Sequence, residues 1–207
     1  MQMVDAMERS GALSDSRVAA AARKVPREVL LPEGFADQAY LDVPLALELG
    51  SFEPSPLVQV AMVQAARVGG EQRVLDLEPG QGYRAALCAM MGARVYCLVG
   101  SPNDQQTLQT NLRNVGLANV TVELGQEATG LPRYAEYNVL FGCWTPRDVP
   151  DTIKDQVRNQ GRFVLLPKPG RDRIEVLKSQ KTTLSPLETI NVGLLSHKYQ
   201  TFLSSAR

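Results

Sequence analysis

Several residue types and patterns are scarce in this chain of 207 residues, and each scarcity argues against a class of function. There is one histidine, His197, and the three cysteines, Cys88, Cys97 and Cys143, form no CxxC pair, so we expect neither a metal site nor a histidine-based catalytic pair. The formal net charge is zero and no long run of Lys and Arg occurs, which argues against a broad nucleic-acid-binding surface.

Apolar segments are also short, and this bears on where the protein works. No apolar run reaches the length of a membrane span, and residues 1–9 contain no apolar core of a signal peptide. The odd number of cysteines and their apolar neighbours indicate small buried side chains in a reducing compartment. We therefore expect a cytoplasmic protein that binds neither membranes nor nucleic acids.

The stretch that organises the chain is residues 74–87. It begins with a short apolar run, residues 74–77, which predicts a buried strand. A turn containing Gly80 and Gly82 follows, and the composition then becomes helical. A strand, a glycine-rich turn and a helix together present backbone N–H groups and a positive helix end to a bound nucleotide. Glycines suit such a turn because they accept positive φ, although turn geometry alone explains both glycines equally well.

Strands and helices alternate after this stretch, which predicts an α/β fold with a mostly parallel sheet flanked by helices. With 44% hydrophobic residues, we expect a single domain over residues 1–207, with a helical cap over residues 1–70 and a Rossmann-like core over residues 71–207. The expected strands after the organising stretch are residues 94–99, 120–124, 137–143, 161–166, 174–178, 188–195 and 200–203, and the expected helices are 16–24 (capped by Ser14 or Asp15), 57–68, 103–115 and 150–160.

Six segments carry a resemblance to a known family, in the order and spacing of that family. The segments are residues 25–33 (V-P-R-E and L-P-E), 39–45 (A-Y-x-D-x-P-L), 50–56 (where the family has G-Q-T-I-S-Q-P), 74–86 (where it has V-L-E-I-G-T-G-S-G-Y-Q-A-A), 111–120 (N-L and G-x-x-N-V) and 161–167 (G-x-x-V and P). Together they resemble the protein-L-isoaspartate O-methyltransferase family over most of the chain. The resemblance implies a Rossmann-like class I methyltransferase fold, S-adenosylmethionine as methyl donor, and L-isoaspartyl carboxylates of damaged proteins as acceptors.

The glycine-rich turn departs from the family at one position. The family has E/D-x-G-x-G-x-G; Asp76, Gly80 and Gly82 fit this pattern, but Glu78 replaces the first glycine. The resemblance places that glycine where the cofactor comes nearest the backbone, so Glu78 adds bulk and negative charge there, with a steric cost if its φ is positive. Asp76 has two equal interpretations, as a cofactor-binding residue or as an acceptor of backbone N–H bonds within the turn.

Three further departures lie at strand ends. Where the family has a Glu that accepts hydrogen bonds from the ribose hydroxyls, this chain has Val99, which leaves two hydroxyls unpaired at a cost of about 1–3 kcal/mol each. Gln126 replaces the Asp that faces the adenine, a partial loss because an amide still forms hydrogen bonds. Asn138 replaces an Asp at the start of the fourth strand, a mild change.

The acceptor loop, residues 50–56, is also altered. At the position of the family serine that lies close to the reacting carboxylate, this chain has Pro54, which has neither a hydroxyl nor an N–H. Ser55 substitutes only if the loop shifts. We interpret Glu53 as a solvated loop carboxylate that repels an incoming carboxylate unless it points away.

Three hypotheses remain open. In the first, the chain is a diverged relative that has weakened or lost S-adenosylmethionine binding and isoaspartyl methylation, and acts as a binding partner of another protein. In the second, it is an active S-adenosylmethionine-dependent carboxyl O-methyltransferase in protein repair, because methyl transfer needs little beyond alignment. In the third, the old cofactor cleft binds a different small ligand, with Glu78 recognising a cation.

Overall fold

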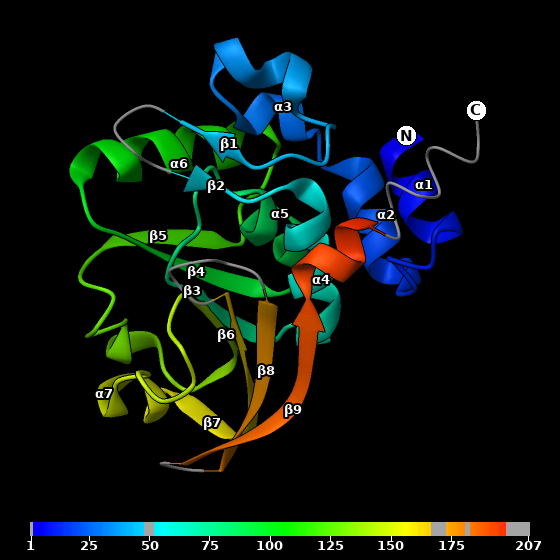
Figure 1. Cartoon of the computed structure of the whole chain (residues 1–207). Helices are drawn as coiled ribbons and strands as arrows, with labels where there is room; N and C mark the ends of the chain where they lie inside the picture. The colour runs from blue at the N-terminus through cyan, green and yellow to red at the C-terminus, as the bar shows by residue number, and fades with distance from the viewer. Residues whose placement is uncertain (1, 48–51, 167–172, 181–182, 198–207) are drawn as a thin grey trace.

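A seven-stranded sheet forms the centre of the computed structural model, which describes residues 2–47, 52–166, 173–180 and 183–197 (Figure 1). The strand order is β5-β4-β3-β6-β7-β8-β9, and neighbours from β5 to β7 are parallel, whereas β8 and β9 are antiparallel additions. The strands are β3 (Arg73–Asp76), β4 (Arg94–Val99), β5 (Val120–Leu124), β6 (Tyr137–Gly142), β7 (Val157–Leu165), β8 (Arg173–Gln180) and β9 (Thr183–Asn191).

The strand of the organising stretch, β3, lies inside the sheet. Val74 pairs with Val95 of β4 on one side and with Val139 of β6 on the other. Val74 and Leu75 are both fully buried and belong to separate apolar clusters, one on each face of the sheet. The continuous apolar run is therefore explained by burial on both faces, as in other parallel sheets. The prediction of an interior strand here is confirmed.

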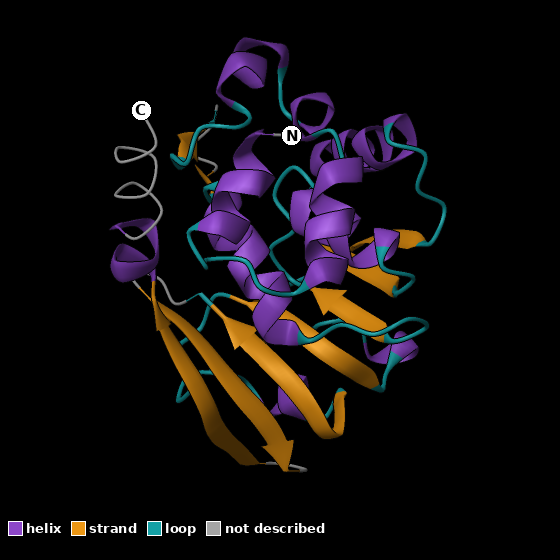
Figure 2. Ribbon diagram, turned by 90° about the vertical axis from the view of Figure 1, so that its right-hand side faces the viewer, coloured by secondary structure: helices purple, strands orange, loops and turns teal. Residues whose placement is uncertain are grey.

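Helices cover both faces of the sheet, with most of them stacked on one face (Figure 2). That face carries the helices of the N-terminal region together with α5 and α6, and the opposite face is covered by α7 and η3. The α/β class with a mostly parallel sheet is confirmed. The helices are α1 (Gln2–Arg9), α2 (Ser16–Lys24), α3 (Arg27–Leu30), η1 (Glu33–Gln38), α4 (Pro56–Ala66), α5 (Tyr83–Met90), α6 (Pro102–Asn114), η3 (Pro132–Tyr134) and α7 (Asp151–Lys154).

The N-terminal helices follow local sequence signals closely. The side chain of Asp15 accepts a hydrogen bond from the backbone N–H of Arg17 and so caps α2, which has the bounds that the sequence predicts. Pro56 occupies the first turn of α4. Between these helices, two short strands, β1 (Leu45–Ala46) and β2 (Phe52–Glu53), pair with each other above the carboxyl ends of the large sheet (Figure 1).

Two predicted elements are wrong. The helix expected over residues 150–160 is confined to α7, because Val157 already pairs with Tyr137 of β6 and begins β7. The pairing is irregular between Tyr137 and Val139, so this long strand has no regular periodicity in the sequence.

The strand expected over residues 188–195 ends early. Asn191 accepts a hydrogen bond from the N–H of Leu194 at 2.9 Å, and residues 192–197 are helical. An Asn side chain that satisfies a free N–H in this way favours a helix start over continued strand. The short strand predicted over residues 200–203 lies outside the described residues.

Candidate functional site

A cleft of about 210 Å³ lies at the carboxyl ends of β3 and β4. From β3 the chain passes to β4 and β5 on one side and then to β6 on the other, so the strand order reverses here, and open α/β sheets bind ligands at such points. Glu78 and Val99, the departures at the turn and at the end of β4, both line this cleft. Its lining comes from the glycine-rich turn, the end of β4 and the first turns of α6: Leu77, Glu78, Pro79, Gly80, Gln81, Leu98, Val99, Gly100, Asp104, Thr107 and Leu108.

Asp76, at the end of β3, is fully buried and engaged by protein groups. Arg84 of α5 donates from Nε to Oδ2 at 2.9 Å and from Nη2 to Oδ1 at 2.6 Å, and the N–H of Glu78 donates to Oδ1 at 3.2 Å. Burial alone lowers the pKa of Arg84, but the charge and hydrogen bonds of Asp76 outweigh burial and raise it. Of the two interpretations of Asp76, the contacts favour the one in which it fixes the turn.

Arg84 also ties down the position that departs from the family glycine. Its Nη2 donates to the carbonyl oxygen of Glu78 at 2.7 Å, and its guanidinium lies 5.0 Å from the centre of the Phe141 ring. Glu78 is not among the residues with positive φ, so the steric cost expected for a left-handed glycine position does not arise. The half-buried Glu78 side chain lines the cleft, and its charge contributes to the raised pKa of Arg84.

Gly80 and Gly82 do require glycine. Their φ values are +55° and +98°, which other residues rarely adopt. A Cβ atom at Gly80 would overlap the carboxylate of Glu53, and one at Gly82 would lie 2.7 Å from Cδ1 of Leu108. Both glycines are thus explained by backbone conformation and close packing of the turn.

Glu53 is the clearest correction to the sequence interpretation, because it is buried with only 1% exposure and is not a solvated loop carboxylate. Its Oε2 accepts from the N–H of Gln81 at 3.0 Å, and its Oε1 accepts from Nε2 of Gln59 at 2.8 Å. Nη2 of Arg27 lies 3.9 Å from Oε1. Burial raises the pKa of Glu53, and the hydrogen bonds and the positive charge of these donors partly offset this rise. Glu53 therefore points toward the glycine-rich turn.

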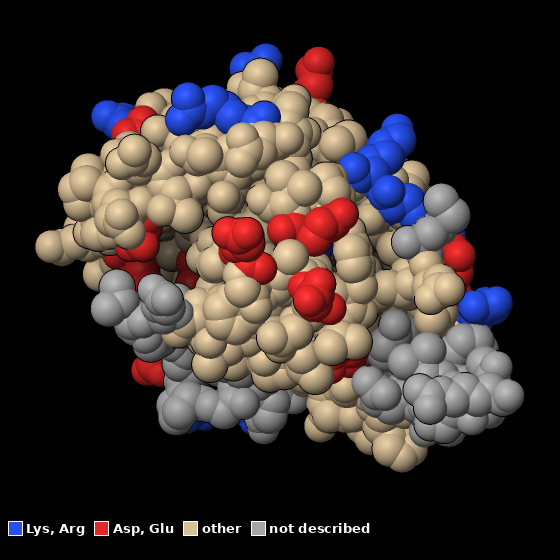
Figure 3. Space-filling view, turned by 90° about the horizontal axis from the view of Figure 1, so that it is seen from above, with Lys and Arg blue, Asp and Glu red and all other residues tan. Residues whose placement is uncertain are grey.

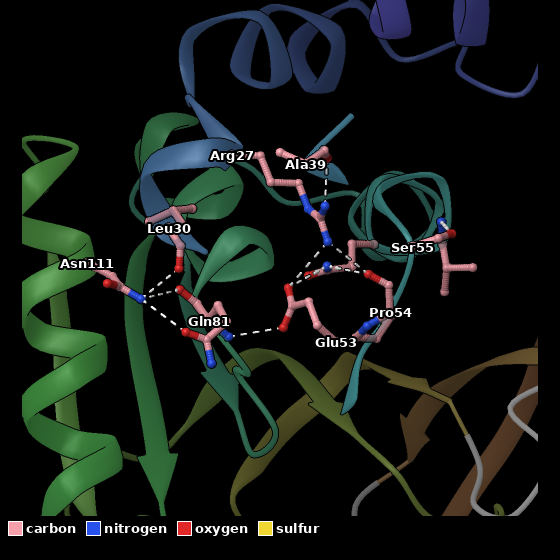
Figure 4. A network of polar contacts seen from close by, with 10 residues as sticks. Arg27, Leu30, Ala39, Glu53, Pro54, Ser55, Gln81 and Asn111 are labelled. Carbon is pink, nitrogen blue, oxygen red and sulfur yellow. Dashed lines mark hydrogen bonds and ion pairs between the residues drawn. The ribbon is translucent and has the colours of Figure 1, made fainter. Parts of the chain in front are cut away.

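Polar contacts from five of the resembling segments meet at this point (Figure 4). The guanidinium of Arg27 donates to the carbonyl oxygens of Ala39 at 2.6 Å and of Pro54 at 3.2 Å. On the other side, Nδ2 of Asn111 donates to the carbonyl oxygens of Leu30 at 2.8 Å and of Gln81 at 3.2 Å. Together with Glu53, these residues form what we call the buried network, which holds the loops around the cleft in fixed positions.

The predicted strand-end residues take different positions. Val99 is 8% exposed and lines the cleft, as expected for the ribose position. Gln126, after β5, is exposed and is not among the residues that line the cleft; its carbonyl oxygen accepts hydrogen bonds from Thr129 and Gly130. Asn138 accepts a hydrogen bond from the N–H of Arg73 at 3.0 Å, a structural contact at the start of the sheet.

Pro54 and Ser55 face a second hollow, of about 200 Å³, which we call the acceptor-side pocket. Oγ of Ser55 accepts a hydrogen bond from the N–H of Val58 at 3.4 Å and caps α4. This hydroxyl, which replaces the family serine only if the loop shifts, thus has a local structural role. The pocket is lined by Asp42, Pro44, Phe52, Pro54, Ser55, Val58, Leu166, Val192 and Ser196.

Acidic side chains gather on the face of the molecule that is seen from above. Viewed from above, Asp and Glu gather in the middle of this face and at a hollow on the left, and Lys and Arg lie mainly at the rim (Figure 3). Glu78 and Asp104 line the cleft, and Asp42 lines the acceptor-side pocket; neither lining, as described, includes Lys or Arg. Coulomb attraction therefore favours cations over anions here.

Sequence reasoning missed Arg84, which is buried beneath the turn, and Asp104, which lines the cleft. Arg84 stands where the family pattern has Gln, and this difference was the available signal for its ion pair with Asp76. Asp104 has a plain signal, because Ser101 and Asp104 form a helix cap with their hydroxyl and carboxylate 2.7 Å apart. In the described ranges, no cluster of three or more His, Cys, Asp or Glu is arranged to hold a metal. A membrane-spanning helix is likewise not found in that part of the chain.

Solved structures of similar fold support the methyltransferase architecture. One, described as a protein-L-isoaspartate O-methyltransferase, has a TM-score of 0.75 at 23% identity over 93% of this chain and 65% of its own. Another, from Plasmodium falciparum, is described as a putative enzyme of the same name in complex with S-adenosyl-L-homocysteine, with a TM-score of 0.73 at 13% identity over 91% of this chain and 94% of its own. That ligand agrees with S-adenosylmethionine as the predicted cofactor of the family.

Sequence comparisons identify the family. A protein-L-isoaspartate O-methyltransferase from Synechococcus sp. (strain JA-2-3B'a(2-13)) is 35% identical over 79% of this chain and 67% of its own. One from Roseiflexus castenholzii is 31% identical over 87% and 82%, respectively. The family model described as "Protein-L-isoaspartate(D-aspartate) O-methyltransferase (PCMT)" matches residues 1–191. The chain therefore belongs to the protein-L-isoaspartate O-methyltransferase family.

Proposed function

We propose that this chain is a diverged family member that binds S-adenosylmethionine weakly or not at all and methylates L-isoaspartyl residues at or near background. The observation that carries the proposal is Val99, an apolar side chain in the wall of the cleft where the family pattern has a ribose-binding Glu. Each buried hydroxyl left without a partner costs about 1–3 kcal/mol. In this proposal the fold is retained for binding another molecule.

Two more features of the cleft support weak cofactor binding. Asp76 has both carboxylate oxygens engaged by Arg84, which leaves it little capacity to accept from a ligand. Glu78 brings a second carboxylate to the turn that faces the carboxylate end of the cofactor, so the two negative charges repel. The residues present therefore fit S-adenosylmethionine poorly.

The acceptor side supports the same proposal. Pro54 supplies neither the hydroxyl nor the N–H of the family serine, and Ser55 caps α4. Glu53 points away from the acceptor loop toward Gln81, so it neither attracts nor directly blocks a substrate. The loss of one positioned donor lowers rates by a factor of about 10²–10³.

The alternative is an active S-adenosylmethionine-dependent O-methyltransferase that repairs damaged isoaspartyl proteins. It is favoured by the retained turn, in which Gly80 and Gly82 keep positive φ at the opening of the cleft. Asp104 also lines the cleft near Val99 and offers a carboxylate from another element, although that carboxylate already accepts from Ser101.

Calorimetric titration of the whole chain with S-adenosylmethionine and with its demethylated product tests the cofactor part of the proposal. We expect no saturable binding in the micromolar range for either compound. Micromolar binding of both would contradict the proposal and favour the alternative.

Transfer of labelled methyl groups to an isoaspartyl peptide at saturating donor tests the reaction. We expect methyl transfer at or near the level measured without protein. Pro54→Ser should raise methyl transfer only if the methyl donor, S-adenosylmethionine, binds. Turnover like that of an ordinary family member would overturn the proposal and show that the loop backbone alone positions the acceptor.

A further inference from the structure

The elements α3, η1, β1 and β2, with the loop between η1 and β1, form the upper part of the molecule (Figure 1). Of the eight large apolar side chains that are exposed in the described part of the chain, five belong to this region: Val29, Tyr40, Leu41, Val43 and Phe52. Leu41 is the most exposed of the five, at 54%. Apolar side chains that gather in one region, rather than scattering singly, mark a surface for binding another molecule.

The same region is acidic. Residues 28–66 contain no Lys or Arg, and the side chains of Glu28, Glu33 and Asp37 are exposed. Seen from above, Asp and Glu gather in the middle of the face, and Lys and Arg lie mainly at its rim (Figure 3). The hydroxyl of Tyr40 donates to Oε2 of Glu28, so apolar and acidic groups are neighbours. We call these three acidic and the five exposed apolar side chains the cap face.

The acceptor-side pocket lies next to the cap face, because Phe52 belongs to both. Its lining is mostly apolar and includes Pro54, Val58 and Val192. The volume, about 200 Å³, exceeds the roughly 150 Å³ apolar cavity that is known to hold a benzene ring. The pocket therefore has room for one apolar side chain of a partner, and a few buried anchors of this kind supply most of the binding energy of a protein interface.

From these observations we propose that the cap face binds a basic amphipathic segment of another protein. Apolar side chains of that segment cover Leu41 and Val43, with one of them in the acceptor-side pocket, and its Lys or Arg side chains lie beside Glu33 and Asp37. Burial of the apolar side chains supplies affinity, and the opposite charges steer the encounter and select the partner. The inference deepens, and rests on, the part of the proposed function in which the fold is retained for binding another molecule.

The charge of the cap face selects this class of partner over others that an apolar surface attracts. Nucleic acids and anionic lipid headgroups carry phosphates, which the exposed carboxylates repel, and an acidic peptide is repelled in the same way. Arg27, which directly precedes residues 28–66, is buried and engaged by Glu53 and by the carbonyl oxygens of Ala39 and Pro54. It therefore offers no charge to an anionic partner at this face.

Three synthetic peptides of about 14 residues, roughly four helical turns, provide the probes for the whole chain. The first has Leu on one face of the helix and Lys on the other. The second has Glu in place of Lys. The third has the Leu and Lys of the first in an order that leaves no apolar face. Each is titrated without S-adenosylmethionine, with calorimetry for affinity and backbone amide chemical shifts in NMR for the location of the site.

The first peptide should bind at least about tenfold more tightly than either of the others, with shifts at Val29, Leu41 and Phe52. Equal or tighter binding of the Glu peptide would show that the carboxylates do not select the partner, and equal binding of the third peptide would show that the apolar side chains do not. Either result would overturn the inference. So would absence of binding of the first peptide at millimolar concentration, or shifts confined to the Glu78 cleft.

One pair of variants tests the apolar part of the cap face. Leu41→Ser with Val43→Ser should weaken the first peptide by about tenfold, because two exposed apolar contacts are lost. Leu187→Ser, at an exposed apolar position of β9, is the matched control and should change nothing. Thermal unfolding confirms that each variant is folded. Unchanged affinity in the folded double variant would contradict the inference.

A second pair tests the charged part. Glu33→Gln with Asp37→Asn keeps the shape of the surface and should weaken the first peptide while reducing the dependence of its affinity on salt. Asp155→Asn removes an exposed carboxylate outside the cap face and should leave both quantities unchanged. Equal salt dependence in the double variant and the unaltered chain would show that these carboxylates do not face the partner, and would overturn the inference.

Two further measurements separate the inference from its neighbours. Glu78→Gly with Val99→Glu alters the cleft and should leave peptide binding unchanged, so failure of the inference and failure of the proposed loss of cofactor binding are distinguishable; altered peptide binding would place the site in the cleft and overturn the inference. Sedimentation of the chain alone should show a monomer. A dimer that Leu41→Ser with Val43→Ser abolishes would assign the cap face to a second copy and overturn its assignment to another protein.

Discussion

The buried network and the wall of the cleft lie on two sides of the same glycine-rich turn, yet they differ in how their polar groups are satisfied. In the network, Glu53 accepts from Gln59 and Gln81, and Asn111 donates to two carbonyl oxygens. In the wall, Val99 offers no polar atom, and Glu78 brings a charge to a ligand-facing position. The network holds the loops through satisfied hydrogen bonds, whereas the wall carries an apolar side chain and a carboxylate at positions where the family pattern has a Glu and a Gly.

This difference distinguishes the residues that hold the family fold together from the residues that line the two hollows. Segments that match the family supply most of the network, including Arg27, Gln81 and Asn111. The departures, Glu78, Val99 and Pro54, line the two hollows instead. The residues that hold the turn are therefore different from those at the departures, so a change at a departure leaves the contacts of the buried network in place.

The ion pair beneath the turn offers the largest effect. Arg84→Met leaves Asp76 charged and unpaired in a fully buried position, and we expect a loss of about 3–5 kcal/mol in the free energy of unfolding. Urea denaturation measures this loss. Arg94→Met, at an exposed position of β4, serves as control and should change stability by less than about 0.5 kcal/mol. Equal losses in the two variants would show that the pair does not hold the turn.

Restoring the family residues in the cleft wall should have the next largest effect. We expect Glu78→Gly with Val99→Glu to tighten binding of S-adenosylmethionine by about 10–100-fold, because two ribose hydroxyls regain an acceptor and one repulsion is removed. Calorimetry measures the affinity. Leu124→Glu, an exposed substitution at the end of β5, is the matched control and should leave affinity unchanged. If the unaltered chain binds S-adenosylmethionine in the micromolar range and the double change weakens this binding, Glu78 is a ligand contact.

The pH dependence of stability tests the buried network. Because burial raises the pKa of Glu53 above its ordinary value of 4.5, its favourable contribution is fully present below pH 4.5 and is lost as the pH rises through the folded-state pKa. Relative to Glu53→Gln, the free energy of unfolding of the unaltered chain should fall by up to about 1.4 kcal/mol per pH unit in that window. Urea unfolding at several pH values measures it, with exposed Glu33→Gln as control. A constant difference between the chain and Glu53→Gln would contradict the raised pKa.

The smallest effect concerns the role of Ser55. If its hydroxyl only caps α4, Ser55→Ala should cost about 0.5–1 kcal/mol of stability and leave any methyl transfer unchanged. Ser101→Ala removes the equivalent cap of α6 and provides the comparison for stability. A loss of methyl transfer without a matching loss of stability would instead assign Ser55 to the acceptor site.

Local sequence signals predicted much of the fold and part of the cleft. The exact bounds of β4 and β5 followed from apolar runs, those of α2 from an N-cap, and the cleft from glycines after an apolar strand. The start of β7 at Val157 did not follow, because pairing with β6 overrides the helical pattern of residues 150–160. The family segments were recognisable, but their joint role in one network was not.

The sequence by itself determined the family, most of the strands and helices, and the residue types at the ends of β3 and β4, because each depends on neighbours within one segment. Only the tertiary structure decided how charges are placed. Glu53 is buried because Gln59 and Gln81 donate to it across the fold, and Asp76 is neutralised because α5 carries Arg84 beneath the turn. Whether a carboxylate is solvated or buried depends on such distant partners, and no local pattern records them.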